Sequence, residues 1–166
     1  MIQHPFPPLY DKNSGILILG SFPSVKSRET AFFYGHPQNR FWKVLSRVLE
    51  APLPETIAEK REFLLSHGVA LWDVIASCDI RGSSDASIRN AIPNDLTKIL
   101  DIGKIRQVYV NGQTAGRLYR KYQEEPLCSV YGDCARAIVL PSTSPANAAW
   151  TPDKLIAEWK RLIDFK

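Results

Sequence analysis

The chain has 166 residues, of which 45% are hydrophobic and 23% are charged. These proportions are those of an ordinary globular domain, and the length suffices for one domain with a sizeable core. We therefore expect a single domain over residues 1–166. No apolar stretch approaches the ~18 residues of a membrane span, and the Pro-rich segment 1–9 lacks the regions of a signal peptide. We expect a cytoplasmic, monomeric protein that does not bind membranes.

The formal net charge is +4 and the sequence pI is about 9.0. A net positive charge permits nucleic-acid binding without demonstrating it. Three cysteines, Cys78, Cys128 and Cys134, fit a reducing compartment, and their odd number argues against a complete disulfide framework. Because no Cys-x-x-Cys pair occurs, we expect no metal site. Nothing in the sequence signals a cofactor.

Four short apolar runs predict buried strands at residues 15–20, 69–72, 107–110 and 137–140. Helical patterns occupy residues 41–49, 55–67, 113–123 and 152–165. This alternation predicts an α/β fold, namely a three-layer α/β/α domain around a central, mainly parallel four-stranded sheet. Ligands of such sheets bind beyond the carboxyl ends of the strands.

The polar segment 77–95 interrupts this alternation and is dense in Arg, Ser, Asp and Asn. Long loops inside compact domains are often functional. A surface excursion containing a short helix explains the composition equally well. Both interpretations stay open from the sequence.

The loop after the first predicted strand consists of Gly20, Ser21, Phe22, Pro23 and Ser24. Gly20 would let the backbone approach a ligand closely, and the loop amides could donate hydrogen bonds to a developing anion. A plain tight turn is the alternative. Asn111 occupies the corresponding place after the third predicted strand.

The run 34–42 combines a turn, a His, a side-chain amide, a cation and aromatic residues. The aromatic residues that precede it or begin it are Phe32, Phe33 and Tyr34. They are either core residues or a platform on which a base stacks, an interaction that contributes about 1–3 kcal/mol per base. His36 precedes a proline, which favours extended backbone, so its side chain could face a cleft or make a structural hydrogen bond.

Asn39 stands at the start of the first long predicted helix. One interpretation is an N-cap, a position that Asn favours. The other is a functional amide that holds a water or the edge of a base. An amide does not titrate in the useful range and cannot be a strong general base. It can still orient a nucleophile when the transition state is largely dissociated.

A second polar loop follows the last predicted strand and contains Ser142, Thr143, Ser144, Pro145 and Asn147. Its hydroxyls and amides could grip phosphates, and its small residues could fill the hole left by an extruded base. An ordinary connection between a strand and a helix is the alternative.

These segments, in this order, resemble the uracil-DNA glycosylase superfamily over about residues 16–150. The resemblance is closest to the hypoxanthine (deoxyinosine) DNA glycosylase branch, with likeness to the mismatch-specific uracil-DNA glycosylases. It rests on the loop 20–24, the run 34–42 and the loop 141–147. The His-Pro-x-Asn-x-Phe-Trp run is the specific part.

The chain departs from the classical family pattern at two positions. Phe22 stands where classical members carry the Asp or Asn that handles the attacking water. Leu140 stands where they carry the His that donates to the leaving base. Asn39 matches the catalytic Asn of the hypoxanthine-type branch. The resemblance therefore implies that Asn39 is the catalytic residue and that a deaminated purine is the substrate.

The implied activity is hydrolysis of the N-glycosidic bond of a deaminated base flipped out of DNA, hypoxanthine first, at the start of base excision repair. The implied partner is double- or single-stranded DNA with a damaged base, in the cytoplasm of a bacterial or archaeal type of cell. The expected base pocket comprises the loop 20–24, Phe33, Tyr34, His36 and Asn111, and the loop 142–147 would contact DNA. The alternatives are a uracil or mismatch-specific glycosylase, a nucleoside hydrolase and, from another class, a non-catalytic damaged-DNA-binding module.

Overall fold

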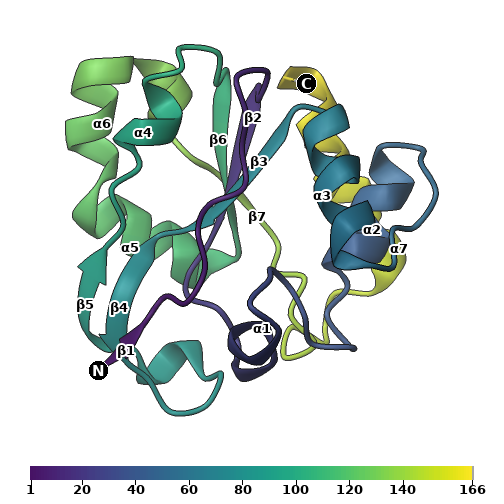
Figure 1. Ribbon diagram of the computed structural model, residues 1–166, viewed down its shortest axis with the longest axis horizontal. Coiled ribbons are helices and arrows are strands. Elements are labelled where there is room, and N and C mark those ends of the chain that lie inside the picture. Colours follow the sequence, from purple (N-terminus) through teal and green to yellow (C-terminus); the bar gives the residue numbers. More distant parts are fainter. Residues whose placement is uncertain (166) are drawn as a thin grey trace.

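A four-stranded parallel sheet forms the centre of the computed structural model, which describes residues 1–165 (Figure 1). Its strands, in the spatial order β3-β2-β6-β7, are β2 (Ile16–Gly20), β3 (Val69–Asp73), β6 (Gln107–Asn111) and β7 (Ile138–Leu140). All neighbouring strands run parallel. The predicted α/β fold class is confirmed, because each predicted strand is present with its boundaries shifted by no more than one residue.

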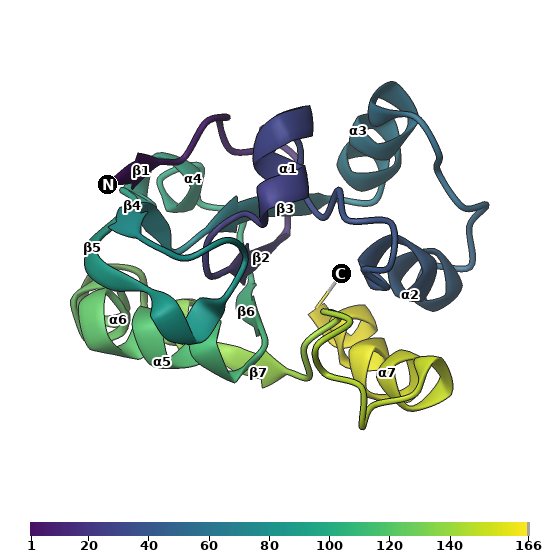
Figure 2. The same cartoon turned by 90° about the horizontal axis from the view of Figure 1, so that it is seen from below.

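Helices cover both faces of this sheet, as the two perpendicular views show (Figures 1 and 2). One face carries α2 (Phe41–Val48), α3 (Ile57–Ser66) and α7 (Pro152–Trp159). The other carries α4 (Thr97–Leu100), α5 (Gln113–Tyr122) and α6 (Glu124–Tyr131). Among the described residues, no helix is both long and apolar enough to span a membrane.

Local sequence accounts for the boundaries of two of these helices. Thr56 caps α3 in a reciprocal capping box with Glu59, a pattern that satisfies two backbone N–H groups. Thr151 caps α7, and Pro152 occupies its first turn. The helix predicted for 152–165 is α-helical only to Trp159 and continues as a 3₁₀-helix, Lys160–Phe165.

A second, three-stranded antiparallel sheet was not predicted. It consists of β1 (Ile2–Gln3), β4 (Ile75–Asp79) and β5 (Arg89–Pro93) in the order β1-β4-β5. The polar segment 77–95 therefore holds most of a β-hairpin, with a 3₁₀ turn at Asp85–Ser87. Register shifts in the β4–β5 pair and the positive φ of Asn90 break the alternation that would reveal these strands.

The sheet positions the predicted loops at one edge of the molecule. Register places Gly20 beside Asp73, and Asn111 beside Leu140. The short helix α1 (Val25–Thr30) and the loop 141–147 follow β2 and β7 at this edge, which Figure 2 shows from below. Every residue of β2 is buried, as is typical of a strand that is covered on both faces of the sheet.

Candidate active site

A cavity of about 300 Å³ lies beyond the carboxyl ends of β2, β3 and β6. We call it the strand-end pocket. Its volume is at the lower end of the range of small-molecule sites. The walls come from the segment after β2, the aromatic segment before α2, the polar segment after β4 and the loop 141–147.

The structure brings nearly all of the predicted site residues together around this pocket. Those that line it are Gly20, Ser21, Phe22, Pro23, Ser24, Phe33, Tyr34, His36, Asn39, Asn111, Ser142, Thr143, Ser144 and Pro145. Asn147 is absent from the lining and faces an adjoining groove. Its side-chain amide donates to the Ser142 carbonyl at 3.0 Å, so it holds the shape of its own loop.

Hydrogen bonds define the orientation of both amides in the pocket. The backbone N–H groups of Thr143 and Phe41 donate to Asn111 Oδ1 at 3.1 Å and to Asn39 Oδ1 at 2.9 Å. A backbone N–H requires an oxygen acceptor, so each amide has one possible orientation. Asn111 Nδ2 then donates to Thr143 Oγ1 at 3.0 Å, and that hydroxyl donates to Asn39 Oδ1 at 2.9 Å.

This relay leaves one group of Asn39 available. Its Oδ1 already accepts two hydrogen bonds, the full capacity of a carbonyl oxygen. Its Nδ2 donates to no group within residues 1–165, and the residue lines the pocket. Asn39 therefore contacts the start of α2 much as an N-cap does, and it also presents two N–H donors to a ligand.

Arg40, which the sequence analysis did not single out, fixes the loop 141–147 against α2. Its Nη2 donates to the carbonyls of Ser144 at 2.8 Å and Asn147 at 3.1 Å, and its Nη1 donates to the carbonyl of Trp150. Its backbone N–H donates to the Thr143 carbonyl at 3.1 Å. A planar guanidinium suits this role because it offers several donors in a fixed geometry.

Of the predicted stacking residues, Phe33 and Tyr34 line the pocket and Phe32 does not; Phe22 is a third aromatic residue in its wall. Phe33 is buried against Phe6 and Trp72. The Arg28 guanidinium lies over the Phe22 ring, 5.7 Å from its centroid. Tyr34 has a positive φ of 51° and packs on Phe41. All three border the pocket, so stacking by one of them stays a prediction.

The Tyr34 hydroxyl is buried and has no hydrogen-bond partner within the described residues. Burial raises the pKa of this hydroxyl and the charge of Asp73 raises it further, whereas the nearby Asn111 side-chain amide, which makes no direct hydrogen bond to the hydroxyl, lowers it. The group is therefore a protonated donor at neutral pH.

His36 makes the structural hydrogen bond considered above. Its Nδ1 accepts from the backbone N–H of Gln38 at 3.1 Å, which leaves Nε2 beside the pocket. Direct chemistry by His36 stays untested.

The polar segment 77–95 supplies part of the pocket wall. Ser83 and Asp85 line the cavity, and Asp85 accepts a hydrogen bond from the Ser21 hydroxyl at 2.8 Å. Ser83 accepts from the backbone N–H of Val25, which ties this segment to α1. Desolvation raises the pKa of Asp85, and the charge of Asp73 acts in the same direction.

Sequence reasoning missed a buried pair at the pocket. Asp73, which directly follows the predicted strand 69–72, accepts a hydrogen bond from His4 Nε2 at 2.7 Å. Asp73 could have been found, because a carboxylate at the carboxyl end of a buried strand lies where ligands bind. His4 gave no such signal, since it lies 69 residues away in the chain. Within residues 1–165 no group of three or more His, Cys, Asp or Glu could hold a metal ion.

The glycine at position 20 is required by close contacts. A Cβ built on Gly20 would lie 2.4 Å from Asp73 Oδ1 and 3.2 Å from the Tyr34 hydroxyl. We expect Gly20→Ala to displace the carboxylate, to lower the free energy of unfolding by about 1–3 kcal/mol and to impair ligand binding in the pocket. Urea unfolding and activity assays measure the two effects.

Gly15→Ala is the matched control for this prediction. Gly15 lies just before the other end of the same strand, and its added Cβ would meet the Arg106 guanidinium at 3.1 Å, the flexible end of a side chain. We expect this variant to keep its activity. Equal loss of activity in both variants would contradict a specific role for the space above Gly20.

Comparison with known proteins gives consistent matches over nearly the whole chain. The model of the uracil DNA glycosylase superfamily matches residues 7–165. A protein named hypoxanthine DNA glycosylase from Methanosarcina acetivorans is 34% identical over 165 residues, which are 98% of this chain and 99% of that protein. A protein of the same name from Methanosarcina barkeri is 32% identical over 149 residues, covering 89% of each chain.

The fold agrees with a solved structure. The solution NMR structure of a candidate uracil DNA glycosylase from M. acetivorans has a TM-score of 0.76 and 33% identity, and the match covers 98% of this chain and 99% of the other. The expected enzyme class, a DNA N-glycosylase, is confirmed by the family match and the relatives. The chain therefore belongs to the uracil DNA glycosylase superfamily.

Proposed function

We propose that this enzyme hydrolyses the N-glycosidic bond of hypoxanthine in DNA. The observation that carries the proposal is the fixed Asn39 amide, which lines the pocket and has a free Nδ2. Position 22 carries no carboxylate or amide and position 140 carries no imidazole, so neither of the classical catalytic groups is present. The names of the two curated relatives support hypoxanthine as the base.

The proposed mechanism starts with extrusion of the lesion from the duplex. Extrusion costs a few kcal/mol, and the cost is smaller for a mispaired base. The exposed Pro145 and Ala146 stand at the rim of the pocket, where they would occupy the space that the base leaves. Arg40 would keep this loop rigid during insertion, because it holds the loop through backbone carbonyls.

Bond cleavage would proceed through a sugar with oxocarbenium character, as in other glycosyl hydrolyses. A cation of this kind reacts with a weak nucleophile, so water needs to be held in place more than deprotonated. The Asn39 Nδ2 would donate to the oxygen of this water, and the proton that the water loses on attack would pass to the departing base anion through solvent. Backbone amides of the segment 20–24 would stabilise the negative charge on the departing base.

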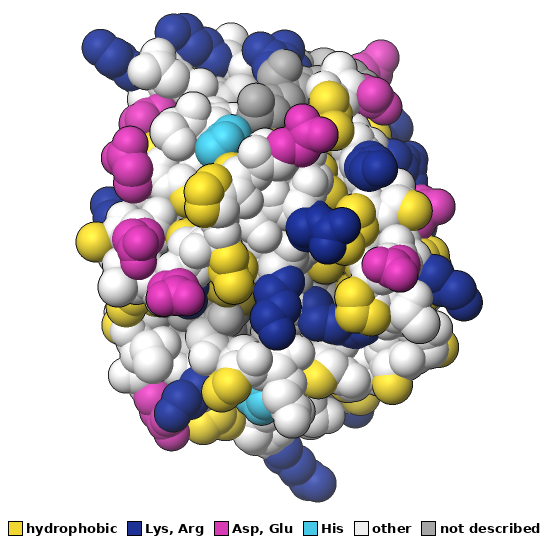
Figure 3. Space-filling model, turned by 90° about the vertical axis from the view of Figure 1, so that its right-hand side faces the viewer, with side chains coloured by type: hydrophobic (Ala, Val, Ile, Leu, Met, Phe, Trp, Pro, Cys, Tyr) yellow, Lys and Arg dark blue, Asp and Glu magenta, His cyan; other side chains and the backbone are white. Residues whose placement is uncertain are grey.

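DNA binding would use phosphate contacts. The net charge is +4, and Figure 3 shows Lys and Arg side chains gathered near the middle of the face formed by α2, α3 and α7. Lys43 and Arg47 on α2 are exposed. Contacts of this kind release counterions, so the affinity should fall linearly with the logarithm of salt concentration.

A base-release panel tests the proposal. Oligonucleotides of one sequence carry hypoxanthine, xanthine or uracil, in single strands and opposite each normal base, and free base is measured by chromatography. We expect hypoxanthine to be released with the highest kcat/KM. A higher value for uracil would contradict hypoxanthine as the substrate. Tight binding of every lesion without release would show a damage-binding module instead.

A further inference from the structure

A groove of about 590 Å³ lies next to the strand-end pocket. We call it the adjoining groove. Its walls are the start of α5, the end of β7, the loop 141–147 with Trp150, and Glu158 of α7. Its volume is within the range of small-molecule sites. Asn111, Ser142 and Ser144 line both cavities, so the groove and the pocket share a wall.

Trp150 is the aromatic residue of the adjoining groove. It is half-buried, and its ring contacts no other aromatic ring within residues 1–165. Its backbone is held at both sides, because its N–H donates to the Asn147 carbonyl at 3.2 Å and its carbonyl accepts from Arg40 Nη1. The groove therefore has an anchored aromatic ring on which a flat ligand can stack.

The charge of the adjoining groove argues against a phosphate as its ligand. Within the described part of the chain, its lining contains the carboxylates of Asp85 and Glu158 and no Lys or Arg. Like charges repel, so a phosphate would be disfavoured here. A neutral ligand that carries N–H groups could instead donate to these carboxylates.

The rest of the lining is complementary to a nucleobase. Val139 is 36% exposed although it lies on a strand of the central sheet, and Pro141 adds a second apolar contact. The Gln113 side chain is exposed and makes no hydrogen bond within residues 1–165. A base has an apolar face that stacks on aromatic rings and a polar edge that pairs with amides and carboxylates.

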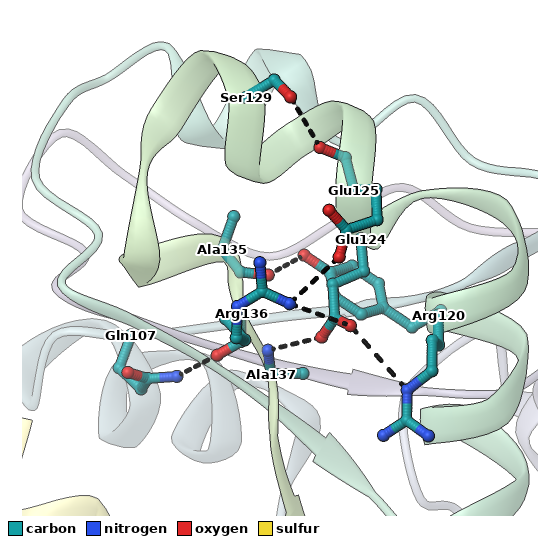
Figure 4. A network of polar contacts seen from close by, with 9 residues as sticks. Gln107, Arg120, Glu124, Glu125, Ser129, Ala135, Arg136 and Ala137 are labelled. Carbon is teal, nitrogen blue, oxygen red and sulfur yellow. Dashed lines mark hydrogen bonds and ion pairs between the residues drawn. The ribbon is translucent and has the colours of Figure 1, made fainter.

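The polar groups around Glu124, at the other end of α5, are arranged differently. Glu124 accepts from the Ala137 backbone N–H at 3.0 Å and pairs with Arg120 and Arg136, and Gln107 donates to the Arg136 carbonyl at 2.7 Å (Figure 4). That cluster satisfies its own polar groups, as a structural network does. Those of the adjoining groove are open to solvent, which a ligand can displace.

We infer that the adjoining groove is a second base site, which holds the nucleobase next to the lesion on the same strand, stacked on Trp150. The inference rests on the proposed function and deepens it. The wall shared with the strand-end pocket places the groove beside the flipped nucleotide, where the next base of the strand can reach it. Stacking of that base on Trp150 offsets part of the cost of opening the DNA.

The test replaces the nucleoside on the 5′ or the 3′ side of hypoxanthine with a tetrahydrofuran spacer, which keeps the sugar and phosphate and lacks the base. The measured quantity is kcat/KM for hypoxanthine release from single strands and duplexes. A spacer weakens the stacking of the lesion and lowers its cost of extrusion. Without a second base site, kcat/KM would therefore stay equal or rise.

We expect kcat/KM to fall about 10-fold with the spacer on one of the two sides, as the loss of one base–aromatic stack predicts. Values that are unchanged or higher with both spacers would overturn the inference. A fall caused only by a spacer opposite the lesion would also overturn it, because the base in the groove would then belong to the other strand. This comparison uses wild-type protein, so no folding defect affects it.

Variants of Trp150 test the stacking platform. Trp150→Ala should lower kcat/KM about 10-fold for the complete oligonucleotide and leave it unchanged for the one with the sensitive spacer, which has already lost the stack. Trp150→Phe keeps a ring and should retain most of the wild-type value. A purely structural role would lower kcat/KM equally for both oligonucleotides, and that result would rule out Trp150 as the platform.

Tyr122→Ala is the matched control. Tyr122 is a half-buried aromatic residue at the far end of α5, where Lys121 Nζ lies 5.1–5.2 Å scale distance from no groove residue but 5.2 Å from the Tyr122 ring centroid. Its loss should leave the ratio of the two kcat/KM values at that of the wild type.

Tryptophan fluorescence gives a readout that does not depend on base release. The other three tryptophans, Trp42, Trp72 and Trp159, are at most 6% exposed, so quenching by a stacked base reports on Trp150. We expect the complete oligonucleotide to quench the fluorescence more than the one with the sensitive spacer, and Trp150→Phe to lose this difference. Equal quenching by both oligonucleotides would overturn the inference.

The outcomes separate this inference from the proposed function. Wild-type protein that releases no base from any oligonucleotide contradicts the proposed function. Normal release of hypoxanthine without dependence on either neighbouring base overturns the inference alone.

Discussion

Asn39→Ala is expected to lower the rate of base release by about 100- to 1,000-fold, the usual loss on removing one preorganised donor from an active site. Binding of lesion-containing DNA should stay close to wild type, because phosphate contacts supply most of that affinity. Single-turnover release kinetics and fluorescence anisotropy measure the two quantities. An Asn39→Ala enzyme with wild-type rates would refute the catalytic role of this residue.

Two further variants separate catalysis from stability in this experiment. Asn39→Ala also removes the acceptor for the Phe41 N–H, so it should cost about 1 kcal/mol of unfolding free energy, as other cap losses do. Thr56→Ala removes the cap of α3, far from the pocket, and should cost as much while keeping activity. Asn39→Asp keeps the Oδ1 acceptor and replaces only the Nδ2 donor. We expect it to fold normally and to be as inactive as Asn39→Ala, and high activity would contradict the role of Nδ2.

Arg40→Met is expected to have the next largest effect, because it releases the loop 141–147 from α2. Several backbone carbonyls lose a cationic donor at once. Hydrogen bonds to charged groups contribute about 1.5–3 kcal/mol each, and partial exposure of Arg40 allows water to replace some of them. We therefore expect a loss of roughly 2–3 kcal/mol in unfolding free energy, together with weaker binding of lesion-containing DNA.

Arg40→Lys and Arg120→Met complete this test. Lys keeps the charge but cannot reach several carbonyls in one plane, so Arg40→Lys should recover little of the lost stability. Arg120 is 73% exposed in its side chain and lies on α5, across the sheet from α2. Its replacement removes the same charge and should change stability by less than about 1 kcal/mol. Similar losses for Arg40→Met and Arg120→Met would contradict the loop-holding role.

The parts of the fold that follow from the sequence are those with local signals. The buried strands are continuous apolar runs, and the helices carry caps or one-sided apolar patterns. The loops after β2 and β7 could be placed at the pocket because parallel strands end at one edge of the sheet. Asn39 was identified through a motif that the resemblance made specific.

The remaining site residues depend on contacts between distant segments. His4 meets Asp73 across 69 positions of the chain. Arg40 binds carbonyls 104 to 110 positions away, and a backbone carbonyl has no signature in the sequence. The β4–β5 hairpin lacks clean alternation because of its register shifts. Such features arise from tertiary packing, which a pattern along the chain does not report.

The amide relay from Asn111 through Thr143 to Asn39 has a consequence for the order of events in folding. Its last link joins residues 104 positions apart, so a large loop must close before the Asn39 amide is oriented. During synthesis, β2, β3 and β6 can pair before the segment that carries Thr143 has left the ribosome. The nascent chain thus acquires most of its sheet early, whereas the walls of the strand-end pocket are complete only once its final fifth has been made.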